Sequence, residues 1–128
     1  MVYLFVFGAK IEDRMGHWWF ILFYFLSGLA GNFLYVVTNH SSLIPAIGAS
    51  GAISGILGAY LAFYPMKRQK VFFGTVNLPV FVSFGSWFLF QLLLGWVDFS
   101  LGIQQVGWFA HVGGFLSGML LAWCYMVL

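Results

Sequence analysis

The apolar run at residues 18–37 most constrains how this chain can fold. No Asp, Glu, Lys, Arg or His occurs in it, and only four small or amide residues interrupt its apolar character: Ser27, Gly28, Gly31 and Asn32. A helix of about 20 apolar residues matches the roughly 30 Å hydrocarbon core of a bilayer. The run is therefore predicted to span a membrane.

The rest of the chain has the same character. Of its 128 residues, 62% are hydrophobic and 6% are charged, whereas about 25% are charged in a typical soluble domain. Apolar runs also occupy residues 72–97 and 106–128, with a shorter one at 50–64. None shows the alternation of a membrane β-strand. We expect an all-α, polytopic helical membrane protein with four full spans, preceded by the remnant of an earlier span.

The charges predict an orientation in the membrane. All five Lys and Arg residues lie in the segments 9–17 and 66–71, which are predicted to form polar turns and which two predicted crossings separate. Both segments therefore lie on one side, and the positive-inside rule makes that side cytoplasmic. The turns at 38–48 and 98–105 then face outward. The net charge of +2 arises from too few groups to indicate nucleic-acid binding.

The shortness of the run at 50–64 indicates a site. Fifteen helical residues rise about 22 Å, less than a hydrocarbon core requires. Either the helix starts below the surface or the turn-rich segment before it dips into the membrane. Irregular backbone is tolerated there only where protein buries it or it lines a wet cavity.

A serine and a histidine follow the two outward turns by a few residues. Ser50 begins the short run, between the glycines of Gly48-Ala49-Ser50-Gly51, and His111 lies near the start of the last run. An imidazole can accept the proton that makes a serine hydroxyl a nucleophile. The one acid on the outer side, Asp98, has nothing to place it against His111, so we expect a dyad without a carboxylate.

Backbone groups near the serine would stabilise an oxyanion. The first N–H groups of a helix lack intrahelical partners and carry the positive end of its dipole. The predicted oxyanion site comprises Gly48, Ala49, Ser50 and Gly51. Ser54, one turn further on, would line the same cavity or bond back to the preceding turn.

Glycines at helical spacing predict that the two helices meet. Small residues at offsets of four, seven and eleven share one helix face, and such faces let membrane helices approach closely. The predicted packing positions are Gly51, Gly55, Gly58 and Ala62 in the short run and Gly107, His111, Gly114 and Gly118 in the last run.

Other interpretations of these residues remain. The faces of small residues are also compatible with ordinary helix packing, in which the side chains of Ser50 and His111 bond to neighbours. A metal site is disfavoured because His17, His40 and His111 are dispersed, and the lone Cys124 cannot form a disulfide or a Cys-based metal site within the chain. A transporter or channel would need polar groups along a whole path.

The order of motifs resembles the core of rhomboid intramembrane serine proteases, from residue 2 to residue 128. The matching elements are Glu12-x-Arg14, Gly48-Ala49-Ser50-Gly51, and Ala110-His111-Val112-Gly113-Gly114 with Gly118. The resemblance implies a single rhomboid-like domain, 1–128, that cuts transmembrane segments of other proteins near the outer face. It implies Ser50 as nucleophile, His111 as base and the run at 72–97 as a lateral gate. Substrate proteins and the lipid bilayer are then its partners, and no cofactor or metal is required.

The sequence departs from the rhomboid pattern at its front. The family's first span, its following loop and the His and Asn that help to bind the oxyanion have no counterparts. Losing one oxyanion donor costs about 2.7 to 4 kcal/mol of transition-state stabilisation. We therefore expect a domain incomplete at its N-terminus and weak or inactive alone. The alternative is a non-catalytic rhomboid-like protein that binds single-span partners.

Overall fold

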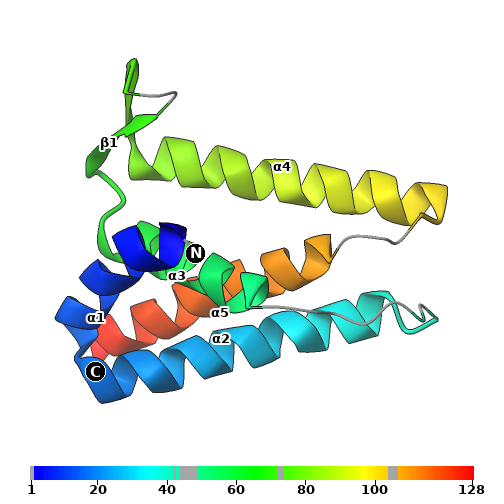
Figure 1. Ribbon diagram of the computed structural model, residues 1–128, viewed down its shortest axis with the longest axis horizontal. Helices are drawn as coiled ribbons and strands as arrows, with labels where there is room; N and C mark the ends of the chain where they lie inside the picture. The colour runs from blue at the N-terminus through cyan, green and yellow to red at the C-terminus, as the bar shows by residue number, and fades with distance from the viewer. Residues whose placement is uncertain (1, 42, 44–48, 72–73, 104–106) are drawn as a thin grey trace.

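The protein is a helical bundle with a small hairpin at one end (Figure 1). The structure, a computed structural model, describes residues 2–41, 43, 49–71, 74–103 and 107–128. Its elements in chain order are η1 (Leu4–Gly8, a π-helix), α1 (Ala9–Met15), α2 (His17–Thr38), α3 (Ser50–Phe63), β1 (Arg68–Val71), β2 (Val76–Pro79), α4 (Val80–Leu101) and α5 (Trp108–Val127).

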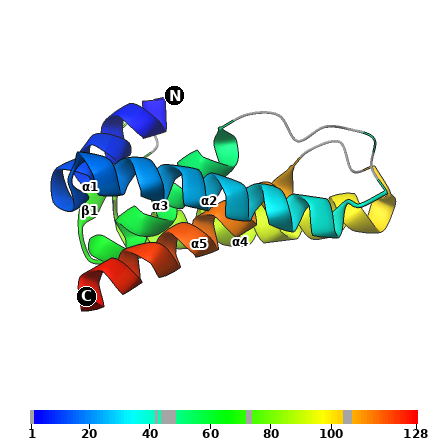
Figure 2. The same cartoon turned by 90° about the horizontal axis from the view of Figure 1, so that it is seen from below.

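Helix α3 is the most buried helix of the bundle. Ten of its 14 residues are buried, compared with four of 22 in each of α2 and α4. Helices α3 and α5 run in the same direction, and α2 and α4 run the opposite way (Figures 1 and 2). Helix α3 begins part-way along the bundle, well short of the end that the last turns of α2 and α4 reach. The depth of this helix start below a membrane surface stays a prediction.

Within the described residues, three helices, α2, α4 and α5, are long and apolar enough to cross a membrane. Many large apolar side chains on their outer faces are exposed, including Phe25 and Leu89 at 64% each, as lipid-facing side chains would be. Helix α3 has 14 residues and rises only about 21 Å. The expected count of four full spans is therefore not confirmed, whereas the helical membrane architecture is.

The first polar segment differs from the prediction. Residues 9–17 were expected to form a turn, but residues 9–15 form α1. Ile11 and Met15, one helical turn apart, are both buried, so packing against the bundle stabilises this short helix. The break falls at Gly16, whose φ of 85° favours glycine. The prediction missed that a charged heptapeptide can carry an apolar stripe.

The predicted span at 72–97 was also misplaced. Strands β1 and β2 pair antiparallel, with Arg68 opposite Pro79, and α4 starts only at Val80. Pro79 precedes the helix with ψ of 149°. At its other end α4 continues past Asp98 to Leu101 and stops at Gly102, which has a left-handed φ of 68°. Four residues assigned to the outer turn are thus helical.

Every Lys and Arg lies at one end of the bundle. Lys10 and Arg14 are on α1, Lys67 follows α3, and Arg68 and Lys70 are in β1. Figure 1 shows α1 and β1 at the same end as the C-terminus, opposite the last turns of α2 and α4. The fold therefore places the two basic segments at the same end of the bundle, as expected for segments that two crossings separate.

Candidate active site

Ser50 is the first residue of α3. Ala49 before it has φ of −80° and ψ of 7°, outside the helical geometry, and its carbonyl accepts the bond from Ile53 N at 2.9 Å. The N–H groups of residues 50 and 51 thus precede the helix's own hydrogen-bond ladder. Ser50 is exposed, so its hydroxyl is accessible at the start of an otherwise buried helix.

The backbones of α3 and α5 touch at three glycines of α3, Gly51, Gly55 and Gly58. A Cβ added to Gly114 would collide with the Gly51 carbonyl, and one added to Gly118 would collide with the Gly55 carbonyl. Gly58 lies against the Phe115 carbonyl in the same way. Such contact requires residues without side chains on the touching faces. We call this contact between α3 and α5 the glycine seam.

Helix α2 packs closely against both α3 and α5. A Cβ on Gly31 would lie 2.5 Å from the Ala110 carbonyl oxygen, and one on Gly55 would lie 2.5 Å from Ser27 Oγ. Ser27 is fully buried and donates to the Phe23 carbonyl at 3.0 Å. The small residues of α2, noted in the sequence only as interruptions of an apolar run, are therefore packing positions.

His111 occupies the first turn of α5 and is half-buried. Its Nδ1 lies 2.8 Å from Oε1 of Gln91 on α4. Two indoles flank the imidazole: Trp108 edge-on, with centroids 6.3 Å apart, and Trp87 tilted, at 6.4 Å. Three side chains from two helices therefore restrict the orientation of this ring.

The structure brings the neighbours of Ser50 and His111 into contact. A Cβ on Gly51 would lie 3.3 Å from the Ala110 carbonyl oxygen, so the residues that follow Ser50 and precede His111 adjoin across the seam. Within the described residues no hydrogen bond joins the two side chains.

The remaining predicted positions fall in different places. Gly48 lies outside the described residues. Gly107 has the Tyr35 ring of α2, rather than α3, as its nearest neighbour outside α5. Ser54 donates to the Ser50 carbonyl at 2.8 Å, which is the plainer of its two interpretations. The residue bonded to His111 is the amide Gln91, and in the described part of the chain no hydrogen bond or ion pair joins Asp98 to the ring.

Sequence reasoning missed Gln91 as a site residue. Its side chain is 6% exposed and faces the bundle with Phe84 and Gly95, on the inner face of a helix that is otherwise apolar there. A polar side chain inside a membrane span points to a specific partner. The position of this glutamine in the middle of a 22-residue apolar run was the available signal.

Comparison with known proteins identifies the family. The model of the Rhomboid domain matches residues 1–127. The chain belongs to the rhomboid family. With its three apolar helices of spanning length, this rhomboid is an integral, multi-pass membrane protein, and the resemblance noted in its motifs is confirmed over nearly the whole chain.

Several curated relatives resemble this rhomboid. RHOMBOID-like protein 1 of Arabidopsis thaliana is 29% identical over 99% of the chain and 30% of its own length. The Rhomboid protease GluP of Bacillus subtilis is 28% identical over 90% of the chain and 20% of its own length. Rhomboid-like protease 3 of Toxoplasma gondii is 30% identical over 98% and 44%.

The rhomboid chain therefore spans less than half the length of these relatives. No solved structure matches it. The family includes intramembrane serine proteases, and two of the relatives named above carry the word protease in their names.

The glycine seam makes a stability prediction. Gly114→Ala and Gly118→Ala should each lower the free energy of unfolding by about 1–3 kcal/mol, the usual cost of overpacking, because the added methyl meets backbone that cannot rotate away. Unfolding of the purified rhomboid in mixed micelles, followed by circular dichroism, measures this. The matched control is Gly85→Ala, where an added Cβ meets nothing within 4 Å. Equal effects of all three substitutions would contradict the seam.

Proposed function

We propose that this rhomboid is an intramembrane serine endopeptidase in which Ser50 is the nucleophile and His111 the general base. The supporting observation is the contact of Gly51 with the Ala110 carbonyl, which sets the start of α3 against the first turn of α5. An accessible hydroxyl and an oriented imidazole then lie on adjoining helices. Membership in a family that contains serine proteases agrees with this pairing.

In the proposed mechanism the serine oxygen attacks the scissile carbonyl carbon. His111 takes the serine proton and later gives it to the leaving amine, and water then hydrolyses the acyl-enzyme with the same base. The neutral imidazole has one N–H. If Nδ1–H donates to Gln91 Oε1, Nε2 carries the lone pair and is the basic atom. Gln91 is thus proposed as a positioning residue that sets the tautomer.

The start of α3 is the proposed oxyanion site. The Ser50 N–H precedes the intrahelical ladder and lies at the positive end of the α3 dipole, where a negative oxygen would be stabilised. Gly51 and Ala49 flank it, and Gly48 belongs to the proposal from sequence alone. These backbone donors require no cofactor or metal.

The proposed substrates are transmembrane segments of other proteins that enter past α4. Helix α4 packs less extensively against α3 and α5 than α2 does, and its buried residues are limited to Val80, Phe84, Gln91 and Gly95. A segment that reaches Ser50 from the lipid would pass this helix. With the basic end of the bundle cytoplasmic, the site would open toward the outer face.

Labelling by a fluorophosphonate serine probe tests the proposed dyad. Probe incorporation in detergent should be lost in Ser50→Ala and in His111→Ala, because the first lacks the nucleophile and the second lacks its base. Ser86→Ala, at an exposed serine of α4, should label like the parent. The assay should include the chain with any upstream coding sequence restored.

Two results would contradict the protease proposal. The first is labelling that persists in Ser50→Ala, which would place the reactive group elsewhere. The second is a folded parent protein that fails to label, also with any upstream coding sequence included, which would favour a non-catalytic role.

Substitution of Gln91 tests the positioning role. Gln91→Leu should lower the labelling rate constant about three- to tenfold, the factor equivalent to one neutral hydrogen bond, whereas Gln91→Glu keeps an acceptor and should label faster than the leucine variant. The ¹⁵N shifts of His111 should report Nδ1 protonation in the parent and mixed tautomers in Gln91→Leu. An unchanged tautomer with a reduced rate would assign Gln91 a purely structural role.

The orientation is tested with single cysteines in a Cys124→Ser background. Ser41→Cys, near the end of α2, should react with a membrane-impermeant maleimide added outside intact cells, because that end is proposed to face outward. Lys70→Cys, in β1, should react only after permeabilisation. The reverse pattern would invert the proposed topology.

A further inference from the structure

The basic end of the bundle contains a pocket of about 380 Å³, lined by Lys10, Asp13, Arg14, Tyr64 and Lys67. We call it the basic pocket. Lys10 and Arg14 lie one turn apart on α1, and Lys67 reaches the same opening from the segment after α3. Three cations and one carboxylate from separate segments therefore share one concavity.

Aromatic faces hold the three cations in place. The Arg14 guanidinium lies 4.4 Å from the Phe63 ring centroid, and Lys67 Nζ lies 5.3 Å from that of Tyr64. Lys10 Nζ lies 5.7 Å from the Tyr60 ring centroid. Cation–π contacts leave an ammonium or guanidinium free to donate hydrogen bonds to an anion. The cations are thus oriented but not neutralised.

No carboxylate in the described part of the chain pairs with these cations. Glu12 is bonded to His17 instead, and Asp13, although it lines the pocket, makes no ion pair within 4.0 Å. The pocket consequently keeps an excess of positive charge. Charge complementarity calls for an anionic occupant.

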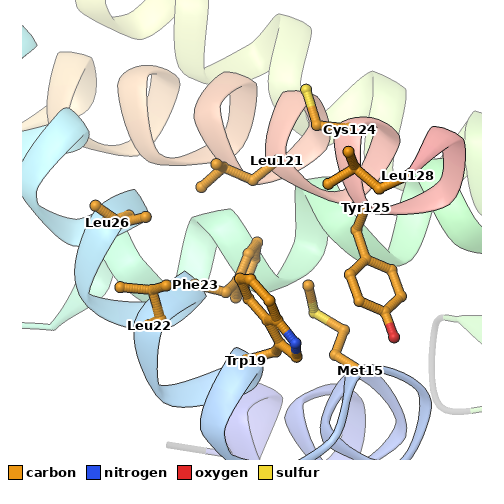
Figure 3. Close-up of a pocket in the computed structure, with 9 residues that line it drawn as sticks. All are labelled: Met15, Trp19, Leu22, Phe23, Leu26, Leu121, Cys124, Tyr125 and Leu128. Carbon is orange, nitrogen blue, oxygen red and sulfur yellow. The ribbon is translucent and has the colours of Figure 1, made fainter.

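The surroundings identify that occupant as a lipid. An apolar cavity of about 470 Å³ lies between α2 and the end of α5, with Tyr125 among the residues that line it (Figure 3). Tyr125 packs edge-on against Phe63 and donates to the Arg14 carbonyl at 3.4 Å. The helix that carries two of the cations is therefore also in contact with an apolar surface, at the end of the membrane-spanning helices.

We propose that the basic pocket binds the phosphate of an anionic phospholipid. Basic pockets between helices at a membrane surface bind such headgroups, and each nearby Lys or Arg strengthens the attraction several-fold. Arg14 can engage the phosphate bidentately, and the two lysines act as point charges beside it. Asp13 opposes the charge and limits the affinity.

Titration of the purified protein with phosphatidylglycerol or phosphatidylcholine, followed by native mass spectrometry, tests the proposal. Lys10→Gln, Arg14→Gln and Lys67→Gln should each weaken phosphatidylglycerol binding about fivefold, without changing phosphatidylcholine binding. The matched control is Lys70→Gln, which removes a cation of the same basic end from outside the pocket. It should bind phosphatidylglycerol like the parent.

A second variant separates lost binding from lost folding. Asp13→Asn removes the one carboxylate of the pocket and should tighten phosphatidylglycerol binding several-fold, a gain that misfolding cannot produce. An equal loss in Lys70→Gln would overturn the proposal by showing diffuse attraction. Complete displacement of phosphatidylglycerol by millimolar inorganic phosphate would also overturn it, in favour of a free-anion site.

Discussion

Direct backbone contact between α3 and α5 is the constraint on which the rest of the bundle depends. Lipid offers no hydrophobic drive for helix association, so packing and polar contacts must hold the helices together. At Gly114 and Gly118 the α3 carbonyls fill the space that a side chain would need. This proximity leaves α3 enclosed, with Ser27 of α2 close to Gly55 on another side, and it sets Ser50 and His111 on adjoining helices.

The helix packing around the candidate site could be predicted because its signals are local. Glycine spacing identifies the touching faces of α3 and α5, and a helix too short to span marks where Ser50 begins. Both features follow from the period of the helix and the thickness of a bilayer. The positions of the basic residues similarly predicted that both basic segments lie at one end of the bundle. The membrane face that this end occupies stays a prediction.

Other features depend on tertiary contacts that no local pattern specifies. The apolar residues that follow Val71 were assigned to a span, but Gly74 and Pro79 direct the chain through a turn and a strand before α4 begins. Helix α1 forms because Ile11 and Met15 find a surface to cover. Gln91 could be recognised as unusual in the sequence, yet its partner lies 20 residues away on another helix.

The hydrogen bond between Gln91 and His111 couples the orientation of the imidazole to the rotation of α4 about its own axis. Successive residues of a helix point about 100° apart, so a rotation of α4 by one position would carry the amide away from the ring. The two indoles that flank the ring, Trp87 and Trp108, offer no matching acceptor. The orientation of the His111 imidazole therefore depends on how α4 is rotated about its own axis. The nitrogen nuclei of that ring would report motion of α4 locally.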